Sequence, residues 1–342
     1  MINRNFFQTH RRAFWLLTGL IAVNLLAWGW ALVMFRHSAA LIAAALLAYG
    51  YGLRHAVDAD HIAAIDNVTR KLMQQGQRPV AVGAYFSLGH SSIVVIACAA
   101  IAATSLLFGD KIGWLHHYGS TIGTLVSALF LLLMAAVNAA ILRDVWRRFE
   151  QVKRGVPFIQ PENAQDMQGG VMTRVFGFAF KLVNRSWQMY LVGFLFGLGF
   201  DTATEIGLLG ISAAGASSGM SVWSIMVFPA LFASGMALID SLDNFVMVGA
   251  YGWAFDKPVR KLYYNMTITA TSVMIALFIG GLETLGLLAD KFNWHQGGWR
   301  IIDGLNENMG NVGYAAVALF ILFWGISAAN YRWKGYDKLG TE

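Results

Sequence analysis

Long apolar runs dominate this sequence of 342 residues. A segment of about 20 apolar residues satisfies its own backbone hydrogen bonds inside hydrocarbon only as a helix. Only 13% of the residues are charged, whereas soluble globular chains carry about 25%. The sequence therefore predicts an all-α polytopic membrane protein with one transmembrane domain over residues 1–342. Its eight expected transmembrane helices lie at roughly 13–35, 39–68, 80–107, 118–142, 188–213, 222–254, 265–289 and 313–332.

The connections between these runs differ in Lys and Arg content, and cytoplasmic loops carry the excess. With the N-terminus in the cytoplasm, 20 of the 25 Lys and Arg residues fall on the cytoplasmic side. Both chain ends are therefore expected to be cytoplasmic, as is the longest connection, a linker at about 143–187. The net charge of +6 follows from these loops, so nucleic acid is not an expected partner. The expected partner surface is the lipid bilayer.

Four of the expected spans contain polar and charged residues at membrane depth. Such residues are energetically unfavourable in lipid and usually functional. They are concentrated in the second, third, fifth and sixth spans. The candidates for a site or a transport pathway are Arg54, His55, Val57, Asp58, Asp60, His61, His90, Asp201, Thr204, Glu205, Asp240, Asp243 and Asn244.

The second span carries the densest group of these residues. In a regular helix, which turns about 100° per residue, His55, Asp58 and His61 fall within a sector of about 120°. All three can therefore face one cavity. Arg54 lies in the same sector four residues before Asp58, so the two can pair. Asp60 points elsewhere in a regular helix.

Asp60 can join the other three only if the backbone unwinds. Gly50 and Gly52, just upstream, would permit such unwinding. Asp66 and Asn67 lie near the cytoplasmic end of the same span and are expected to contact solvent. The second span is thus predicted to hold a site in its middle and a solvated inner end.

Two imidazoles with neighbouring carboxylates form a mixed nitrogen and oxygen ligand set. Neutral imidazole suits nickel, cobalt, copper and zinc, whereas calcium and magnesium favour oxygen alone. His90 supplies a third imidazole from another span. The single cysteine, Cys98, excludes an intrachain disulfide and a thiolate metal cluster. The pattern favours a site for a divalent transition metal.

Some of these residues also have a structural interpretation. His90 is flanked by glycine and serine, so it can be a hydrogen-bonded residue at a close helix contact. The acids of the fifth and sixth spans can be partners of Arg54, further ligands or proton carriers. The sequence leaves these alternatives open.

Two segments three spans apart are similar to each other. The segment Phe86–His90 aligns with Phe232–Met236, and glycine stands fourth in both. An offset of three spans is odd, so the two units would have opposite orientations. We therefore expect an inverted repeat of spans 2–4 and 5–7, which is typical of secondary transporters.

At these residues the sequence resembles the nickel/cobalt transporter (NiCoT) family. Residues 54–62 read RHAVDADHI and resemble the family's H-x4-D-H signature in the second span. The third-, fifth- and sixth-span motifs are similar to LGHSSIVV at 88–95, LGFDTATEI at 198–206 and GMALIDSLD at 235–243. The resemblance extends over essentially the whole chain.

The resemblance implies a permease of the bacterial inner membrane that imports Ni²⁺, and also Co²⁺ in some members, with high affinity. It implies that His55, Asp58, Asp60 and His61 are essential, with His90 and the acids of the fifth and sixth spans in support. Val57, between the ligands, can tune the choice of nickel or cobalt. The resemblance implies no ATPase subunit, and no cofactor is expected. The absence of a phosphate-binding P-loop pattern agrees with a permease that is not powered by its own nucleotide hydrolysis.

Three alternatives remain from the sequence. A divalent transition-metal exporter could carry similar histidines, although long histidine-rich loops are absent. A cobalt-selective permease would use the same ligand set. An intramembrane metalloenzyme would carry a pattern such as H-E-x-x-H, which the sequence lacks. We therefore expect a transporter and not an enzyme.

Overall fold

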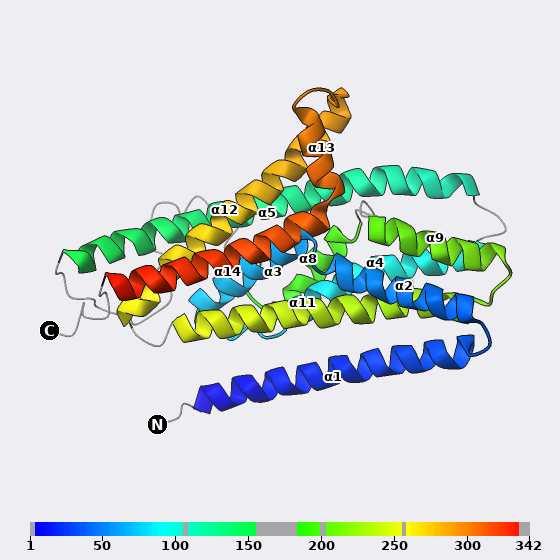
Figure 1. Ribbon diagram of the computed structural model, residues 1–342, viewed down its shortest axis with the longest axis horizontal. Coiled ribbons are helices and arrows are strands. Elements are labelled where there is room, and N and C mark those ends of the chain that lie inside the picture. Colours follow the sequence, from blue (N-terminus) through cyan, green and yellow to red (C-terminus); the bar gives the residue numbers. More distant parts are fainter. Residues whose placement is uncertain (1–3, 105–108, 155–182, 199–202, 255–257, 335–342) are drawn as a thin grey trace.

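The computed structural model describes residues 4–104, 109–154, 183–198, 203–254 and 258–334, and all structural statements concern these ranges. Their regular elements are all helical, as expected, and form an elongated bundle (Figure 1). The start of α1 and the end of α14 lie toward the same end of the bundle. The elements are α1 (Arg4–Phe35), α2 (Ala39–His55), α3 (Ala59–Gln74), α4 (Val82–Thr104), α5 (Gly109–Lys153), the 3-10 turn η2 (Ser186–Gln188), α8 (Met189–Phe196), α9 (Ala203–Ser217), α10 (Val222–Ile225), α11 (Val227–Ala254), α12 (Pro258–Phe292), α13 (Trp299–Glu307) and α14 (Met309–Trp333).

Six helices of the described ranges are long and apolar enough to cross a membrane, and the bent pair α2–α3 would make a seventh span. The expected fifth span, 188–213, falls on α8 and α9, each of which is short by itself. Residues 199–202 between them lie outside the described ranges. The chain is thus a polytopic helical protein, and the count of eight spans stays a prediction.

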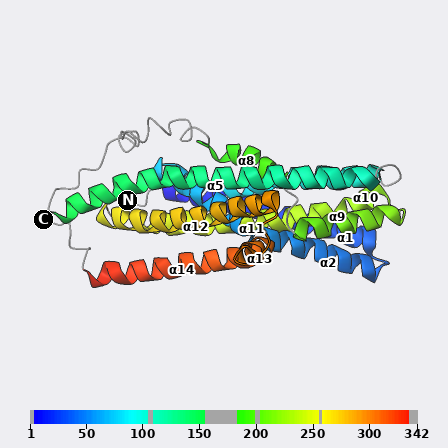
Figure 2. The same ribbon diagram turned by 90° about the horizontal axis from the view of Figure 1, so that it is seen from above.

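The outer helices expose the apolar surface that a bilayer would cover. α1 lies along one edge of the bundle in Figure 1, and α14 lies along an edge in Figure 2. Leu26 of α1 and Ile321 of α14 are 73% and 65% exposed. Large exposed apolar surfaces of this kind are unfavourable in water and favourable in hydrocarbon.

The second expected span is broken. α2 ends at His55, residues 56–58 are not helical, and α3 begins at Ala59 in a direction bent by 49°. Of the two alternatives left open by the sequence, a regular helix and a local unwinding, the structure shows the second, with the break just downstream of Gly50 and Gly52. Helix α14 supports it, because Gly313 lies so close to the Val57 carbonyl that a Cβ atom there would overlap it.

Helix α3 is buried along its whole length from residue 61 to residue 73. The expectation that Asp66 and Asn67 contact solvent is therefore wrong, since both are fully buried. Arg70 of the same helix and residues of two neighbouring helices satisfy them instead. Asp66 accepts hydrogen bonds from Arg70 (2.8 Å) and from Ser272 of α12, and Asn67 accepts one from Asn138 of α5 (2.6 Å).

Helices α2 and α11 approach each other closely through two glycines. A Cβ on Gly52 would overlap the backbone carbonyl of Phe232. Likewise, Gly235 lies against the backbone and ring of Tyr49. Small residues allow such close packing of membrane helices, where apolar burial gives little driving force.

Helices α4 and α8 meet in the same way. A Cβ on Gly193 would overlap the carbonyl of Phe86, and a Cβ on Gly89 would overlap that of Tyr190. The expected tight packing around Gly89 is thus present. This packing fixes the position of α4 relative to α8, and therefore the position of His90, the residue after Gly89.

The expected cytoplasmic linker at 143–187 begins as helix. α5 continues to Lys153, well beyond the expected end of its apolar run, and lies alongside α12 in both views (Figures 1 and 2). Residues 155–182 of the linker lie outside the described ranges. The linker's first part therefore extends one helix of the bundle.

Candidate metal centre

Three buried histidines converge at the break in the second span. His55 is the last residue of α2, His61 lies in the first turn of α3, and His90 lies on α4. Each offers one ring nitrogen, and these nitrogens all lie within 4.8 Å of one another. The three ring centroids form a triangle with sides of 4.6, 4.8 and 4.9 Å. The cluster could hold one metal ion.

Carboxylates orient two of the three rings. His55 Nδ1 lies 2.9 Å from Asp58 Oδ2, and His61 Nδ1 lies 3.3 Å from Asp240 Oδ2 on α11. With its Nδ1 proton donated to a carboxylate, each ring leaves Nε2 as a lone pair for a metal. This carboxylate–histidine arrangement is the usual one at protein metal sites, where it fixes the tautomer and raises ligand basicity.

The third ring is held by Glu205 of α9. Glu205 Oε1 lies 2.9 Å from His90 Nε2 and 3.9 Å from His55 Nε2. The two Nε2 atoms are themselves 2.9 Å apart. Imidazole nitrogens lie about 2.0–2.1 Å from a bound zinc ion, so two ligands at a right angle on such an ion would be about 3 Å apart. The separation of His55 and His90 fits adjacent ligands of one ion.

Two buried ring nitrogens of the cluster, His61 Nε2 and His90 Nδ1, lack a hydrogen-bond partner among the described residues, and one of them, His61 Nε2, points to a ligand. Buried polar atoms are nearly always paired, so an exception at a site calls for an explanation. A cation bound by His61 Nε2 would satisfy that atom, and it would also balance the buried carboxylates of Asp58, Glu205 and Asp240.

Other predicted residues lie around this cluster. Asp60 is not part of the histidine triangle and instead lines a separate cavity. Thr204 Oγ1 is 3.3 Å from His55 Nδ1. Val57 is partly buried within the break. Asp201 lies outside the described ranges.

The expected pairing of Arg54 with Asp58 is not found among the ion pairs of the described chain. Asp58 contacts His55 instead, and Arg54 is exposed. The break at 56–58 removes the regular i, i+4 geometry on which the pairing depended. Asp58 is now the residue that precedes the first turn of α3.

The remaining predicted residues lie further along α11. Asn244 donates to Thr69 Oγ1 of α3 at 2.8 Å, so it joins the two helices. Asp243 is partly exposed and lines a groove of about 450 Å³ between α11, α12 and α14. Among the described residues, no hydrogen bond or ion pair joins either of them to the histidine triangle, and both follow Asp240 along α11 by about one turn.

One partner of the site was not predicted from the sequence. Ser87 donates a hydrogen bond to Asp240, the carboxylate that faces His61. Ser87 lies three residues before His90, on the same helical face, and that spacing was the available signal. Together these contacts connect α4 and α11 to the candidate ligand His61.

Comparison with known proteins decides the family. The sequence model of the NicO family, described as high-affinity nickel-transport protein, matches residues 41–330. The chain belongs to the NicO family. Two relatives agree with this. A protein named high-affinity nickel transport protein, from Cupriavidus necator, is 53% identical over 320 residues, covering 93% of this chain and 91% of that protein. The hydrogenase nickel incorporation protein HupN of Bradyrhizobium diazoefficiens is 52% identical, covering 92% and 82%.

A more distant relative carries a different name. The cobalt transport protein NhlF of Rhodococcus rhodochrous is 37% identical over 287 residues, covering 83% of this chain and 81% of that protein. No solved structure matches this chain. The resemblance to nickel/cobalt transporters is thus confirmed, and NicO is a family of transporters and not of enzymes.

Proposed function

We propose that this NicO protein is a high-affinity secondary transporter that imports Ni²⁺ across the bacterial inner membrane. The observation that carries the proposal is the buried triangle of His55, His61 and His90, with carboxylates behind its rings. The names of two relatives with 53% and 52% identity support nickel as the substrate. A mixed imidazole and carboxylate site without thiolate suits an ion that must be bound selectively and then released.

The proposed roles differ among the site residues. The three histidines are the ligands that replace water around the ion. Asp58 orients His55, and Asp240 orients His61. Glu205 lies within reach of both His55 and His90 and can complete the coordination. In this conformation Asp60 lies beside the site and not within it.

Alternating access is proposed to follow from an inverted repeat of spans 2–4 and 5–7. Two helix pairs share one pattern of contacts: Tyr49 and Gly52 of α2 meet Gly235 and Phe232 of α11. In the other pair, a tyrosine and a glycine with the same spacing, Tyr190 and Gly193 of α8, meet Gly89 and Phe86 of α4. This is the relationship that a two-fold axis in the membrane plane would produce, and it supports the repeat.

The proposed site lies between the two units. The three histidines belong to the first unit, and Glu205 and Asp240 to the second. Rocking of one unit against the other would therefore pull the carboxylates away from the histidines and weaken the ion's coordination. Such movement would couple release of the ion to the change of access.

The proposed driving force is the membrane potential. A dication that enters a negative-inside cell gains about 4.6 kcal/mol per 100 mV, twice the value for a single charge. The proposal therefore needs no ATPase subunit and no cofactor. It places both chain ends and the 143–187 linker in the cytoplasm, on the basis of the Lys and Arg distribution.

Cobalt import is the second candidate, because one relative is named a cobalt transport protein. The experiment that separates the two is accumulation of ⁶³Ni²⁺ by cells expressing this chain, with excess Co²⁺ as competitor. Nickel import predicts accumulation that Co²⁺ only partly suppresses. Accumulation of labelled cobalt without nickel would favour the second candidate. Faster loss of either ion from preloaded cells that express this chain than from cells with an empty vector would indicate an exporter.

A further inference from the structure

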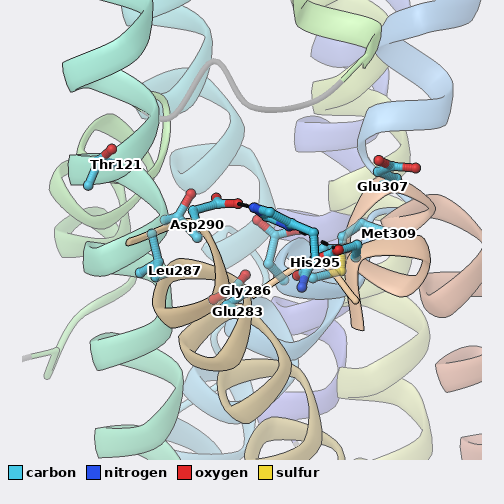
Figure 3. Close-up of a pocket in the computed structure, with 12 residues that line it drawn as sticks. Thr121, Glu283, Gly286, Leu287, Asp290, His295, Glu307 and Met309 are labelled. Carbon is cyan, nitrogen blue, oxygen red and sulfur yellow. Dashed lines mark hydrogen bonds and ion pairs between the residues drawn. The ribbon is translucent and has the colours of Figure 1, made fainter. Parts of the chain in front are cut away.

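A cavity of about 340 Å³ opens between α5, α12 and α13, beside the metal centre (Figure 3). It lies where α12 ends and the chain turns into α13, at the expected non-cytoplasmic side. Its lining comes from five helices and the turn before α13. The residues are Asp60, Thr121, Thr124, Glu283, Gly286, Leu287, Asp290, His295, Asp303, Asn306, Glu307 and Met309.

The charge of this lining is one-sided. Five of the twelve lining residues carry a carboxylate, one is a histidine, and none is a lysine or an arginine. A cleft lined by charges of one sign raises the local concentration of ions of the opposite sign. The cavity is therefore suited to cations.

The mouth of the cavity carries a histidine between two acids. His295 Nδ1 lies 3.1 Å from Asp303 Oδ2, and its Nε2 lies 4.0 Å from Asp290 Oδ1. Asp290 comes from the end of α12 and Asp303 from α13, and Figure 3 shows the ring reaching between the two elements. The mouth thus repeats the donor types of the buried site in an exposed setting.

The interior of the cavity holds carboxylates at membrane depth. Glu283 of α12 is only 5% exposed and accepts a hydrogen bond from Ser127 of α5 at 2.9 Å. A charged acid buried within a membrane span is energetically unfavourable, and such residues are usually functional. Asp60 also lines the cavity, and the next residue in the chain is the ligand His61.

We propose that this cavity is the entry vestibule of the transporter, in which a hydrated divalent cation is held before it reaches the histidines. Asp290, Asp303 and His295 attract the ion at the mouth, and Glu283 guides it inward. Asp60 passes it to His61. The cavity has room for an ion with its shell, since six waters occupy about 180 Å³ at about 30 Å³ each.

This inference rests on the proposed function, because it assigns a role only if the chain transports a dication. The two proposals predict different effects on uptake kinetics. Vestibule acids raise the rate of ion capture, so their loss should raise KM and leave the maximal rate nearly unchanged. Loss of a histidine ligand should remove transport at every ion concentration.

The test measures initial ⁶³Ni²⁺ uptake against Ni²⁺ concentration for wild type, Glu283→Gln and the double variant Asp290→Asn/Asp303→Asn. Each rate is divided by the amount of inserted protein. Steering by charge is worth about tenfold or more in capture rate at low ionic strength. We expect KM to rise by about threefold to tenfold in both variants. High ionic strength should raise KM in wild type and have less effect in the double variant.

The matched control is Glu150→Gln, which removes a partly exposed acid of α5 far along the chain from the cavity, where Lys153 is its ion-pair partner within the described ranges. Its KM should equal that of wild type. Vestibule variants with a wild-type KM, in cells where wild-type uptake is robust and His61→Ala is inactive, would overturn the vestibule and leave the proposed function intact. Absence of wild-type uptake would overturn the proposed function itself.

Discussion

His55 Nε2 and His90 Nε2 lie 2.9 Å apart, although 35 residues and a break in the helix separate the two histidines along the chain. A ring nitrogen holds at most one proton, and His90 Nε2 also has Glu205 Oε1 at 2.9 Å. One proton can serve both contacts only as a shared, weaker hydrogen bond, whereas one cation between the three atoms can contact all of them. The separation of these two atoms therefore links the broken span to metal binding.

His90 is predicted to act as a ligand and not as a packing residue. The variant His90→Gln keeps a side-chain donor for Glu205 but loses the imidazole lone pair. We expect Ni²⁺ uptake to fall to the vector level at every ion concentration tested, because the ion loses one of its three imidazole ligands. The measurement is uptake kinetics with inserted protein quantified. A wild-type KM would indicate that His90 has only a structural role at the α4–α8 contact.

Asp240 is predicted to position His61. Asp240→Asn keeps the size of the side chain but removes the charge that orients the ring. Changes to such partners weaken metal binding by about 10–100-fold. Ser87→Ala, which removes only the hydroxyl that bonds to Asp240, should have a smaller effect in the same uptake assay. A larger effect for Ser87→Ala than for Asp240→Asn would contradict this order.

The close approach of α2 and α11 is predicted to depend on Gly52. The Cβ atom of an alanine at this position would overlap the Phe232 backbone. Gly52→Ala should therefore destabilise the protein by about 1–3 kcal/mol, the usual range for overpacking. Gly50→Ala is the control, since a Cβ there meets nothing within 4 Å. Thermal unfolding in detergent measures both. Equal melting temperatures for the two variants would refute the packing argument.

The buried pair of Asp66 and Arg70 is predicted to be needed for stability. Asp66→Ala would leave the Arg70 charge buried without its carboxylate, which is typically worth about 3–5 kcal/mol of lost stability. The exposed pair of Glu150 and Lys153 offers a comparison, because exposed pairs contribute only about 0–1 kcal/mol. Thermal unfolding of Asp66→Ala and Glu150→Gln should therefore differ clearly. Similar stabilities would mean that Arg70 finds another partner.

The helical class and two of the three converging histidines could be predicted from the sequence, because both depend on local patterns. Apolar runs define membrane helices one at a time, and a regular helix already brings His55 and His61 to one side. Unwinding of the second span was an open alternative, but its position at residues 56–58 could not be predicted, since tertiary contact with Gly313 supports it. For that reason the pairing of Arg54 with Asp58 was wrong.

Partners from other helices were harder to assign. Glu205 and Asp240 were recognised as unusual acids, but their contacts with His90 and His61 depend on how the helices pack. The burial of Asp66 and Asn67 has the same origin. Both residues look like those of a solvated helix end, yet α5 and α12 cover them and supply their hydrogen bonds. The residues around Asp66 and Asn67 in the sequence do not show that other helices will bury them.

The most direct test of the account is ⁶³Ni²⁺ accumulation in cells that express wild type, His61→Ala or an empty vector, with membrane insertion verified for both proteins. His61 is the ligand whose buried Nε2 has no partner among the described residues. The account predicts strong accumulation by wild type and only vector-level accumulation by His61→Ala. Accumulation by His61→Ala equal to that of wild type would contradict a transport site at the histidine triangle.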